Sequence, residues 1–254
     1  MFVEERKQRI LNILKQKEKV SVNELSNLFS VSKVIIRKDL CQMEEENLLT
    51  RTHGGAIFKK KIVNKSILKD INKDEFEKIT FLAEKILNVI EENETIFLDE
   101  SKISILAAAL LQKKKMKISV ISNSLEIQKI LSENKDIQII SLGGVYDSKS
   151  NSFTGEIARD NLELFNIDKT FISVGGVNID KMFLSTHSID NGKFKNTAIK
   201  MGSKNYIIAE NKQFFQDSIF NFSQLEPQMN IITDESLSKE IYNKLIEQQI
   251  NVIK

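Results

Sequence analysis

The apolar positions at the start of the chain recur at the spacing of short amphipathic helices. Residues 3–17 carry an apolar stripe flanked by charged side chains, which predicts a first helix. Residues 21–29 predict a second helix, because Ser21 and Glu24 have the spacing of a capping box and apolar residues follow at helical intervals. Short helices of this kind need a shared core, so a third packing element is expected close by.

The third predicted helix begins at Ser32, after a turn formed only by Ser30 and Val31, and is expected to stop at Asn47. Its apolar face carries Ile36, Leu40 and Met43, and Val34, Arg37, Lys38 and Cys41 fall roughly opposite that face. A short helix, a tight turn and a second helix with basic residues near its start form the helix-turn-helix pattern, whose second helix enters the DNA major groove. The alternative is a helical hairpin whose charged face is merely solvated.

Two strand-like runs follow the third helix and favour DNA binding over that alternative. Residues 48–52 and 56–58 flank a Gly54-Gly55 turn, which predicts a small hairpin. A hairpin directly after a recognition helix is the wing of a winged helix. Arg51 and His53 on this wing would reach a phosphate or the minor groove.

Beyond a linker predicted over residues 59–73, the pattern becomes an alternation of helices and buried strands. Helices are predicted over 75–90, 103–111, 125–131, 156–165, 195–201 and 237–248, and strands over 95–98, 117–121, 137–142, 169–174, 206–209, 230–233 and 251–253. Apolar strands that alternate with helices predict a mostly parallel sheet covered on both faces. The chain is therefore predicted to be α/β, with a DNA-binding domain at residues 1–58 and a larger α/β domain at residues 74–254.

Polar loops follow the predicted strands, and a ligand of such a sheet binds beyond the carboxyl ends of its strands. Their hydroxyls, amides, glycines and lysines suit a metabolite with hydroxyl or phosphate groups. The candidate residues are Asp99, Ser101, Lys102, Asn123, Gly143, Gly144, Gly175, Lys195, Glu210 and Lys212. Each of these residue types is also ordinary in turns, so their shared location is what indicates a pocket.

Charge is distributed unevenly along the chain. Residues 1–61 hold 13 Lys and Arg against 8 Asp and Glu, a net +5, whereas the whole chain has a net charge of +2. The remaining residues therefore carry a net −3, and a basic small domain beside a slightly acidic larger one suits contact with a phosphate backbone.

Other features narrow the class of protein. The longest apolar run, Ile105 to Leu111, is far below the roughly 20 residues of a membrane span, and no signal peptide pattern is present. The single cysteine, Cys41, excludes an internal disulfide and fits a reducing compartment. His53 and His187 lie far apart without other ligands at metal spacing. We expect a cytoplasmic protein without membrane partner, metal or cofactor.

The first 58 residues closely resemble the DeoR family of bacterial transcription repressors. The resemblance is carried by Arg6-x-x-x-Ile10-Leu11, Val20-Ser21-Val22-x-Glu24-Leu25, Val31-Ser32-x-x-x-Ile36-Arg37-Lys38-Asp39-Leu40 and Leu49-x-Arg51-x-His53-Gly54-Gly55-Ala56. We expect Lys33, Val34, Arg37 and Lys38 to face the major groove, and Ser21, Ser32, Arg51 and His53 to contact the backbone or flanks. The family usually has Thr in place of Ile35 and Gly in place of Asn47, so the operator preference stays open.

Residues 75–254 resemble the DeoR-type sensor domain, which is related in fold to ribose-5-phosphate isomerase and CoA transferases. The matching residues are Ile96-Phe97-Leu98-Asp99, Ser122-Asn123-Ser124, Leu142-Gly143-Gly144, Phe153-x-Gly155, Val174-Gly175-Gly176-Val177, Ser185-Thr186 and Lys195. The resemblance implies that Ser185 and Thr186 also belong to the site. It further implies that a phosphorylated sugar or related metabolite controls DNA binding.

The departures from the family concentrate in the loops of this candidate site. The family typically follows its loop aspartate with a glycine and two hydroxyl residues, whereas this chain has Glu100, Ser101, Lys102 and Ile103. Asn191 stands near the position of a common glutamate, and the usual Asp-x-Ser-Lys loop is replaced by residues 210–213. We therefore expect an effector that differs from the common sugar phosphates, or a weak response to ligand.

Together these patterns predict a DNA-binding transcription regulator that represses a carbohydrate-use operon. One domain of this size reads few base pairs, so a symmetric homo-oligomer on repeated half-sites of double-stranded DNA is expected. The alternative is a sugar-phosphate isomerase-like enzyme with an accessory DNA-binding domain, for which Asp99, Glu100 and Glu210 offer carboxylates. A nonspecific nucleoid protein would need more basic charge and no sensor domain.

Overall fold

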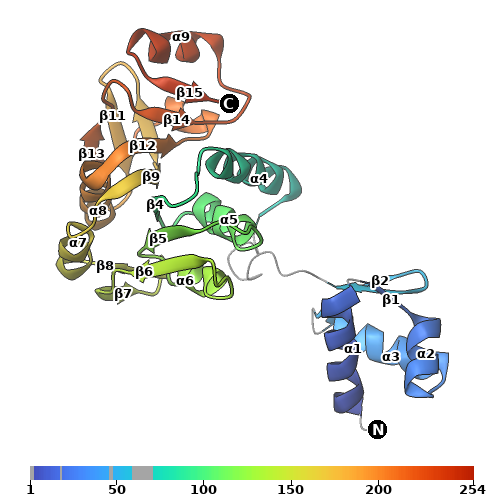
Figure 1. Cartoon of the computed structure of the whole chain (residues 1–254). Helices are drawn as coiled ribbons and strands as arrows, with labels where there is room; N and C mark the ends of the chain where they lie inside the picture. Colours follow the sequence, from blue (N-terminus) through green and yellow to red (C-terminus); the bar gives the residue numbers. More distant parts are fainter. Residues whose placement is uncertain (1–2, 18, 46–47, 59–70) are drawn as a thin grey trace. The chain divides into compact units, whose positions relative to one another are not determined.

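The computed structural model describes residues 3–17, 19–45, 48–58 and 71–254. The chain divides into two compact units, residues 1–61 and residues 62–254 (Figure 1). The predicted helix stop at Asn47 and residues 59–70 of the predicted linker lie outside the described residues. The predicted domain limits at residues 58 and 74 therefore stay a prediction.

Three short helices and a three-stranded sheet enclose the core of the first unit. The helices are α1 (Val3–Lys17), α2 (Val22–Phe29) and α3 (Lys33–Glu45), and the strands are β1 (Lys19–Ser21), β2 (Leu49–Thr52) and β3 (Gly55–Phe58). The antiparallel sheet has the order β1-β3-β2. Its core consists of Ile10, Leu14, Val20, Val22, Leu25, Ile36, Leu40, Met43, Leu49 and Ala56. The three predicted helices and the apolar face predicted for the third are confirmed.

The hairpin turn falls one residue earlier than the sequence indicates. Thr52 pairs with Gly55, so the turn consists of His53 and Gly54, and Gly55 belongs to β3. A Cβ atom on Gly55 would lie 2.0 Å from the carbonyl oxygen of Val20 on β1. Gly55 is therefore required by the close approach of two strands. The apolar pattern did not predict β1, so this reason could not be seen in the sequence.

A buried ion pair holds α3 against α1. Arg6 on α1 donates from Nε and Nη2 to Oδ2 and Oδ1 of Asp39 on α3, at 2.6 and 3.0 Å. Arg6 is 6% exposed and Asp39 is 3% exposed. A two-point contact between a planar guanidinium and a carboxylate fixes orientation as well as distance. It therefore fixes which face of α3 turns toward solvent.

A seven-stranded parallel sheet forms the centre of the second unit (Figure 1). Its order is β15-β14-β12-β9-β4-β5-β6, and every pairing is parallel. The strands are β4 (Thr95–Leu98), β5 (Ile118–Ser122), β6 (Ile137–Ser141), β9 (Ile167–Ser173), β12 (Gly202–Ile208), β14 (Asn230–Ile232) and β15 (Asn251–Ile253). The chain runs outward from β4 to β6, returns to β9 beside β4, and then runs outward on the other side. The boundary between β4 and β9 is thus the topological switch point, where sheets of this kind bind ligands.

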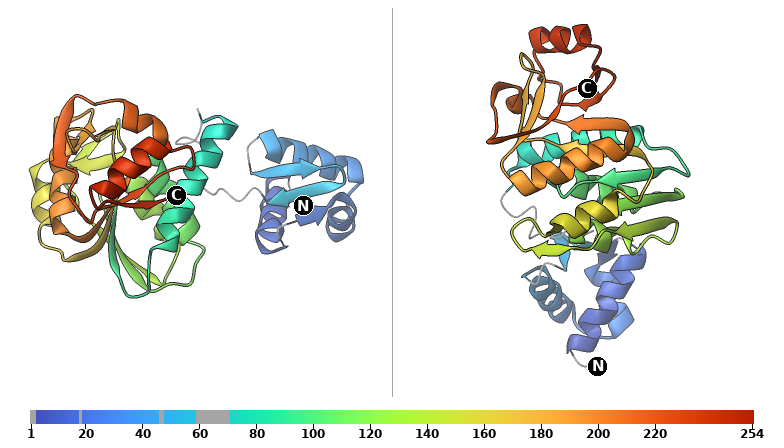
Figure 2. Two further views of the ribbon diagram at one scale, coloured as in Figure 1. Left: turned by 90° about the horizontal axis from the view of Figure 1, so that it is seen from above. Right: turned by 90° about the vertical axis from the view of Figure 1, so that its left-hand side faces the viewer.

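Helices cover both faces of this sheet, as the parallel alternation predicted (Figure 2). One face packs on α4 (Lys73–Asn88), α5 (Lys102–Leu111) and α6 (Leu125–Leu131), and the other on α7 (Glu156–Leu162), α8 (Ile189–Met201) and α9 (Lys239–Glu247). Neighbouring strand residues alternate between the two cores: Phe97 lies in one and Leu98 in the other. This alternation explains why the strands read as continuous apolar runs.

The sequence did not predict the smaller antiparallel elements of this unit. A second sheet has the order β10-β11-β13 and consists of β10 (Gly176–Asn178), β11 (Phe183–Thr186) and β13 (Phe220–Gln224). A hairpin is formed by β7 (Val145–Asp147) and β8 (Ser152–Thr154), and a 3-10 turn, η1, covers Asn211–Phe215. The prediction that a helix starts at Lys195 was wrong: α8 begins at Ile189, where the Ser188 hydroxyl accepts from the Asn191 amide. The earlier start places Asn191 and Lys195 one turn apart on the same side of α8.

We predict that Asp39→Asn lowers the stability of the first unit by about 3–5 kcal/mol, because the Arg6 guanidinium would stay buried without its counter-charge. Hydrogen exchange of the amides in α1 and α3 of the full chain would measure the loss. Glu5→Gln is the matched control, because it removes only an exposed ion pair with Arg9 and should cost less than about 0.5 kcal/mol. Equal protection in the two variants would show that the buried pair does not hold α3.

Candidate functional site

The outer face of α3 is exposed and basic. Lys33, Arg37 and Lys38 are all exposed, and Val34 between them is 71% exposed. The start of the helix is tied by Ser32, whose hydroxyl accepts a hydrogen bond from the Ile35 amide at 3.4 Å. The predicted recognition residues therefore share one accessible face. A helix of this size with exposed cations has the dimensions and the charge to enter a major groove.

The wing and the start of α2 present the remaining predicted DNA-binding residues. Arg51 and His53 are exposed on the β2–β3 hairpin. The backbone amide of Arg51 donates to Oε1 of Glu44 on α3 at 2.8 Å, so the wing is tied to the recognition helix. Ser21 caps α2 by accepting from the Glu24 amide at 3.0 Å. Half of the predicted capping box is thus present, while the Glu24 carboxylate binds Lys17 at 2.6 Å.

At the switch point of the large sheet, a buried carboxylate meets a buried ammonium group. Asp99 follows β4 and is 0% exposed, and Lys195 on α8 is 5% exposed. Their Oδ2 and Nζ atoms are 3.3 Å apart. Nζ of Lys195 also donates to the carbonyl oxygen of Ser173, the last residue of β9, at 2.8 Å. The pair thus joins β4, β9 and α8 at the place where a ligand is expected.

Asp99 also accepts hydrogen bonds from the hydroxyl and amide groups around it. The hydroxyl of Ser104 and the amide of Ser101 donate to its Oδ1 at 2.7 and 3.2 Å, and the amide and hydroxyl of Ser173 donate to its Oδ2 at 2.7 and 2.5 Å. Burial alone would raise the pKa of Asp99, but Lys195 and the Ser173, Ser104 and Ser101 donors outweigh burial and hold that pKa below its usual value. Asp99 is therefore an anion at neutral pH.

Glu100 forms the second carboxylate of the site. Its Oε1 lies 3.9 Å from Nζ of Lys195 and accepts from the side-chain amide of Asn191 on α8. Its Oε2 accepts from Nδ2 of Asn123, in the loop after β5, at 3.4 Å. Glu100 thus connects two loops and one helix of the large sheet.

The structure brings together four of the predicted effector-binding residues, and their contacts define one cluster. They are Asp99, Ser101, Asn123 and Lys195. Sequence reasoning did not include Ser104 or Ser173 in the site, and it named Asn191 only as a departure from the family and not as a binding residue. Asn191 could have been found from its spacing of four residues before Lys195, had the helix been started at Ser188. Ser173 has no such signal, because only the pairing of β4 with β9 brings it to Asp99.

The other predicted residues make their contacts elsewhere. Lys102 is exposed and lies 3.7 Å from Glu75 on α4, and Lys212 lies 3.1 Å from Glu210. The Ser185 hydroxyl, next to the buried Thr186, accepts from the Ser218 amide and donates to the Gly176 carbonyl.

The predicted glycines have structural reasons of their own. Gly143 and Gly144 have positive φ angles of 62° and 114° before β7. A Cβ atom on Gly175 would lie 2.3 Å from the Ser218 hydroxyl. Backbone conformation therefore explains Gly143 and Gly144, and close packing explains Gly175.

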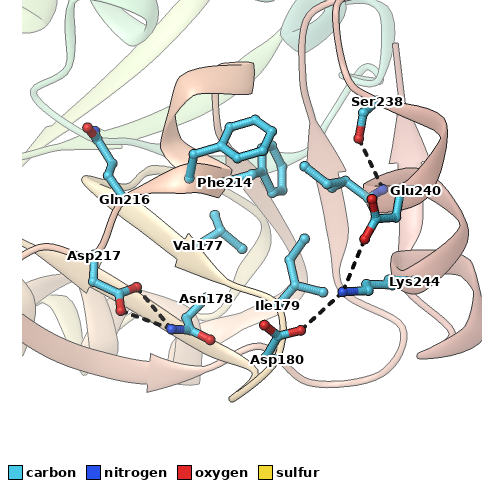
Figure 3. Close-up of a pocket in the computed structure, with 12 residues that line it drawn as sticks. Val177, Asn178, Ile179, Asp180, Phe214, Gln216, Asp217, Ser238, Glu240 and Lys244 are labelled. Atoms are coloured by element: carbon cyan, nitrogen blue, oxygen red, sulfur yellow. Dashed lines mark hydrogen bonds and ion pairs between the residues drawn. The ribbon is translucent and has the colours of Figure 1, made fainter.

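Figure 3 shows a separate cavity of about 330 Å³ between β10, η1 and α9. Lys244 lies in it, 3.2 Å from Asp180 and 3.6 Å from Glu240. Asn178 donates to both carboxylate oxygens of Asp217, at 3.2 and 2.9 Å. The charged side chains in the lining of this cavity thus have partners within the same lining, which includes none of the predicted effector-binding residues. It is therefore not the predicted site.

The described residues contain neither a membrane-spanning helix nor a cluster of metal-binding side chains. No helix there is long and apolar enough to cross a membrane. Nor do the described residues contain a group of three or more His, Cys, Asp or Glu that could hold a metal ion.

Comparison with known proteins gives matches over both units. A model of the DeoR-like helix-turn-helix domain matches residues 6–62, and a model of the DeoR C terminal sensor domain matches residues 75–235. The lactose phosphotransferase system repressor of Lactococcus lactis subsp. lactis is 30% identical, over 92% of this chain and 92% of that protein. The transcriptional repressor AccR of Agrobacterium fabrum is 26% identical, over 91% of this chain and 89% of that protein.

Solved structures give a more distant likeness. Ribose 5-phosphate isomerase A from Methanocaldococcus jannaschii is 11% identical, with a TM-score of 0.40 over 54% of this chain and 53% of that chain. The likeness concerns the fold alone.

We predict that Asp99→Asn destabilises the second unit by about 3 kcal/mol, because Lys195 would keep its charge in a buried site without a carboxylate. Urea unfolding of the full chain, followed by exchange of the amides in β4 and β9, would measure it. The matched control is Glu240→Gln, which removes an exposed carboxylate beside Lys244 and should cost less than about 1 kcal/mol. Similar losses for both variants would contradict a central role for the buried pair.

The contact between Asp99 and Lys195 also makes the stability of the second unit depend on pH. The pKa of Asp99 is lower in the folded chain than its unfolded value of about 3.9. Its contribution to stability is therefore complete well above the unfolded pKa and is lost as pH falls through that value toward the folded pKa. We expect the amides of β4 and β9 to lose protection below about pH 5 in the wild type, and to lose less in Asp99→Asn. Identical pH profiles would exclude this linkage.

Proposed function

The chain belongs to the DeoR family of transcription regulators, and from this premise we propose that it represses a carbohydrate-use operon under control of a sugar phosphate or related metabolite. The observation that carries the proposal is the exposed cationic face of α3 on a unit with its own core. Relatives with this pair of domains include a lactose phosphotransferase system repressor. Those relatives are transcription regulators and not enzymes.

We assign the DNA contacts by chemistry and position. Arg37 can donate two hydrogen bonds to a guanine edge, and Lys33, Lys38 and Val34 flank it on the same face of α3. Ser21, Ser32, Arg51 and His53 lie at helix starts and on the wing, where contacts to the phosphate backbone fix register. The net +5 of residues 1–61 supports a salt-dependent affinity for any DNA. Selectivity would then come from the α3 face.

We assign the effector to the cluster at the switch point of the sheet. Asp99, Asn123 and Lys195 come from three different elements that meet beyond the carboxyl ends of β4, β5 and β9. A small molecule bound there would contact all three elements at once. Lys102, Gly143, Gly144, Gly175, Ser185, Thr186, Glu210 and Lys212 remain candidates for the outer part of the site.

A repressor of this kind acts on chromosomal DNA, so we place it in the cytoplasm as a homo-oligomer. A single α3 reads only a few base pairs. Two copies related by a twofold axis read two half-sites about 34–36 Å apart, or a multiple of that spacing. Symmetric pairing of copies thereby supplies the length of operator that selectivity in a genome requires.

The Asp99 carboxylate does not favour the isomerase-like alternative. A general base needs a free lone pair within reach of the substrate proton. Each oxygen of Asp99 already accepts two hydrogen bonds, and Asp99 is 0% exposed, so it has no lone pair left for a substrate proton. Asp99 therefore acts as a structural anchor.

We expect Arg37→Ala to lower affinity for the operator by about 10- to 100-fold and to relax base selectivity, because a guanidinium–guanine contact discriminates by about 1–3 kcal/mol. Fluorescence anisotropy with operator and scrambled duplexes at fixed salt would measure both. Arg9→Ala is the control: it removes an arginine of the same unit whose guanidinium binds Glu5, and it should leave selectivity unchanged. Intact operator binding by Arg37→Ala would show that α3 is oriented differently.

A genome-wide footprint of the purified full chain on fragmented DNA of its own source tests the proposed function as a whole. At physiological salt we expect a short repeated site upstream of a sugar-use operon, weakened or strengthened by one pool of sugar phosphates or related sugars. A specific site that no pool affects would support the regulator and contradict the metabolite. Absence of any preferred site would contradict both.

A further inference from the structure

The Glu100 carboxylate orients two asparagine side chains. The side-chain NH₂ groups of Asn123 and Asn191 both donate to it, and that of Asn123 also donates to the carbonyl oxygen of Phe153 at 3.3 Å. Turning either amide around would place its oxygen against a carboxylate. The direction of both side chains is therefore fixed by their acceptors.

This orientation leaves two acceptors unused. The Oδ1 atoms of Asn123 and Asn191 are buried and have no hydrogen-bond donor among the described residues. Asn123 as a whole is only 2% exposed. Buried acceptors without a partner are rare in folded proteins, and each calls for a specific reason. A bound group that donates hydrogen bonds would satisfy both oxygens.

The charges of the cluster point to the same kind of group. Asp99, Glu100 and Lys195 together carry one net negative charge. Three backbone amides next to Glu100 and Asp99 are not available to a phosphate: those of Ser101 and Ser173 donate to Asp99, and that of Ser104 donates to the Ser101 hydroxyl. A phosphate brought to Glu100 would meet acceptors and a like charge. A protonated amine would meet a complementary set.

We propose that Glu100, Asn123 and Asn191 form a subsite that binds a hydrogen-bond-donating group of the effector, with an amino group preferred over a hydroxyl, and that excludes phosphate. This subsite rests on the proposed effector function of the same cluster. The effector class is then an amino sugar, with any phosphate placed outside these three residues. The net negative charge is what ranks the amine above the hydroxyl.

The test is calorimetry of the full chain with matched sugars. The probes are glucosamine, galactosamine and mannosamine, the corresponding hexoses, and the 6-phosphates of both sets. We expect at least one hexosamine, free or phosphorylated, to bind about 10-fold or more tightly than its matching hexose. Hexoses and hexose 6-phosphates that bind as well as every hexosamine would overturn the subsite, as would a complete lack of binding by the panel.

Glu100→Gln tests the role of the charge with little change of shape. We expect it to reduce the preference for the amine by about 10-fold, while affinity for the matching hexose changes by less than about threefold. Glu240→Gln is the control for loss of a carboxylate far from the cluster. Asn191→Ala provides a second route if Glu100→Gln does not fold, because it removes one unused oxygen and should also reduce the amine preference. A preference that survives both substitutions would overturn the assignment.

Operator binding measured on the same samples separates the two proposals. A wild-type chain that binds a specific operator but shows no amine preference would overturn the subsite and leave the repressor function intact. A chain that shows the amine preference without any specific DNA site would support the subsite and contradict the repressor function.

Discussion

The buried contact between Asp99 and Lys195 is the constraint on which the second unit depends. A carboxylate at 0% exposure is tolerated only when charge and hydrogen bonds replace water. The chain meets this demand with one ammonium group, the hydroxyls of Ser104 and Ser173, and the backbone amides of Ser101 and Ser173. These partners come from β9, α5, α8 and the loop between β4 and α5. The contact therefore aligns the elements that border the switch point, and it also decides which donors are left for a ligand.

A buried ion pair also determines the structure of the first unit, where it sets the orientation of α3. Arg6 and Asp39 are buried together, and their two-point contact sets the rotation of α3 about its own axis. That rotation places Ile36 and Leu40 in the core and turns Arg37 and Lys38 outward. An apolar contact in the same place would hold the helix but would fix its rotation less firmly, because apolar packing has weaker directional preference. Sequence-selective contacts require a well-defined rotation.

Local pattern was enough to predict the helices, the parallel strands and the exposed face of α3, because those features depend on the period of apolar residues along one segment. It failed where the determinant is a contact between distant segments. β1 is three residues long with one buried side chain, and it forms because Gly55 allows β3 to approach Val20. α8 was started too late because residues 189–193 contain one apolar side chain, Ile189, which is exposed in the structure, and therefore show no repeated apolar spacing before Phe194.

In the candidate site, too, the features set by local pattern could be predicted, and those set by contacts between distant segments could not. The loops that hold Asp99 and Asn123 could be predicted to meet, since parallel strands bring their carboxyl ends to one edge. The commitment of the Ser101 and Ser173 amides to Asp99, and the orientation of two asparagines by Glu100, could not, because they depend on which atoms meet across four elements. From the sequence, Glu100 could be read only as a departure from the family loop and as one of three loop carboxylates. In the structure it also accepts from the side-chain amides of Asn123 and Asn191 and thereby fixes their direction.

Separate cores in the two units limit how a ligand can affect DNA binding. The buried residues around α3 form one cluster, and those around the large sheet form two others. A ligand changes DNA affinity only to the extent that it binds two states of the protein with different affinity. None of the buried clusters formed by the described residues includes side chains of both units, so the large sheet and α3 do not share a core. A ligand that joins Asn123 after β5 to Asn191 on α8 acts across the switch point of the sheet, so the states it can distinguish are those in which α8 sits differently on that edge.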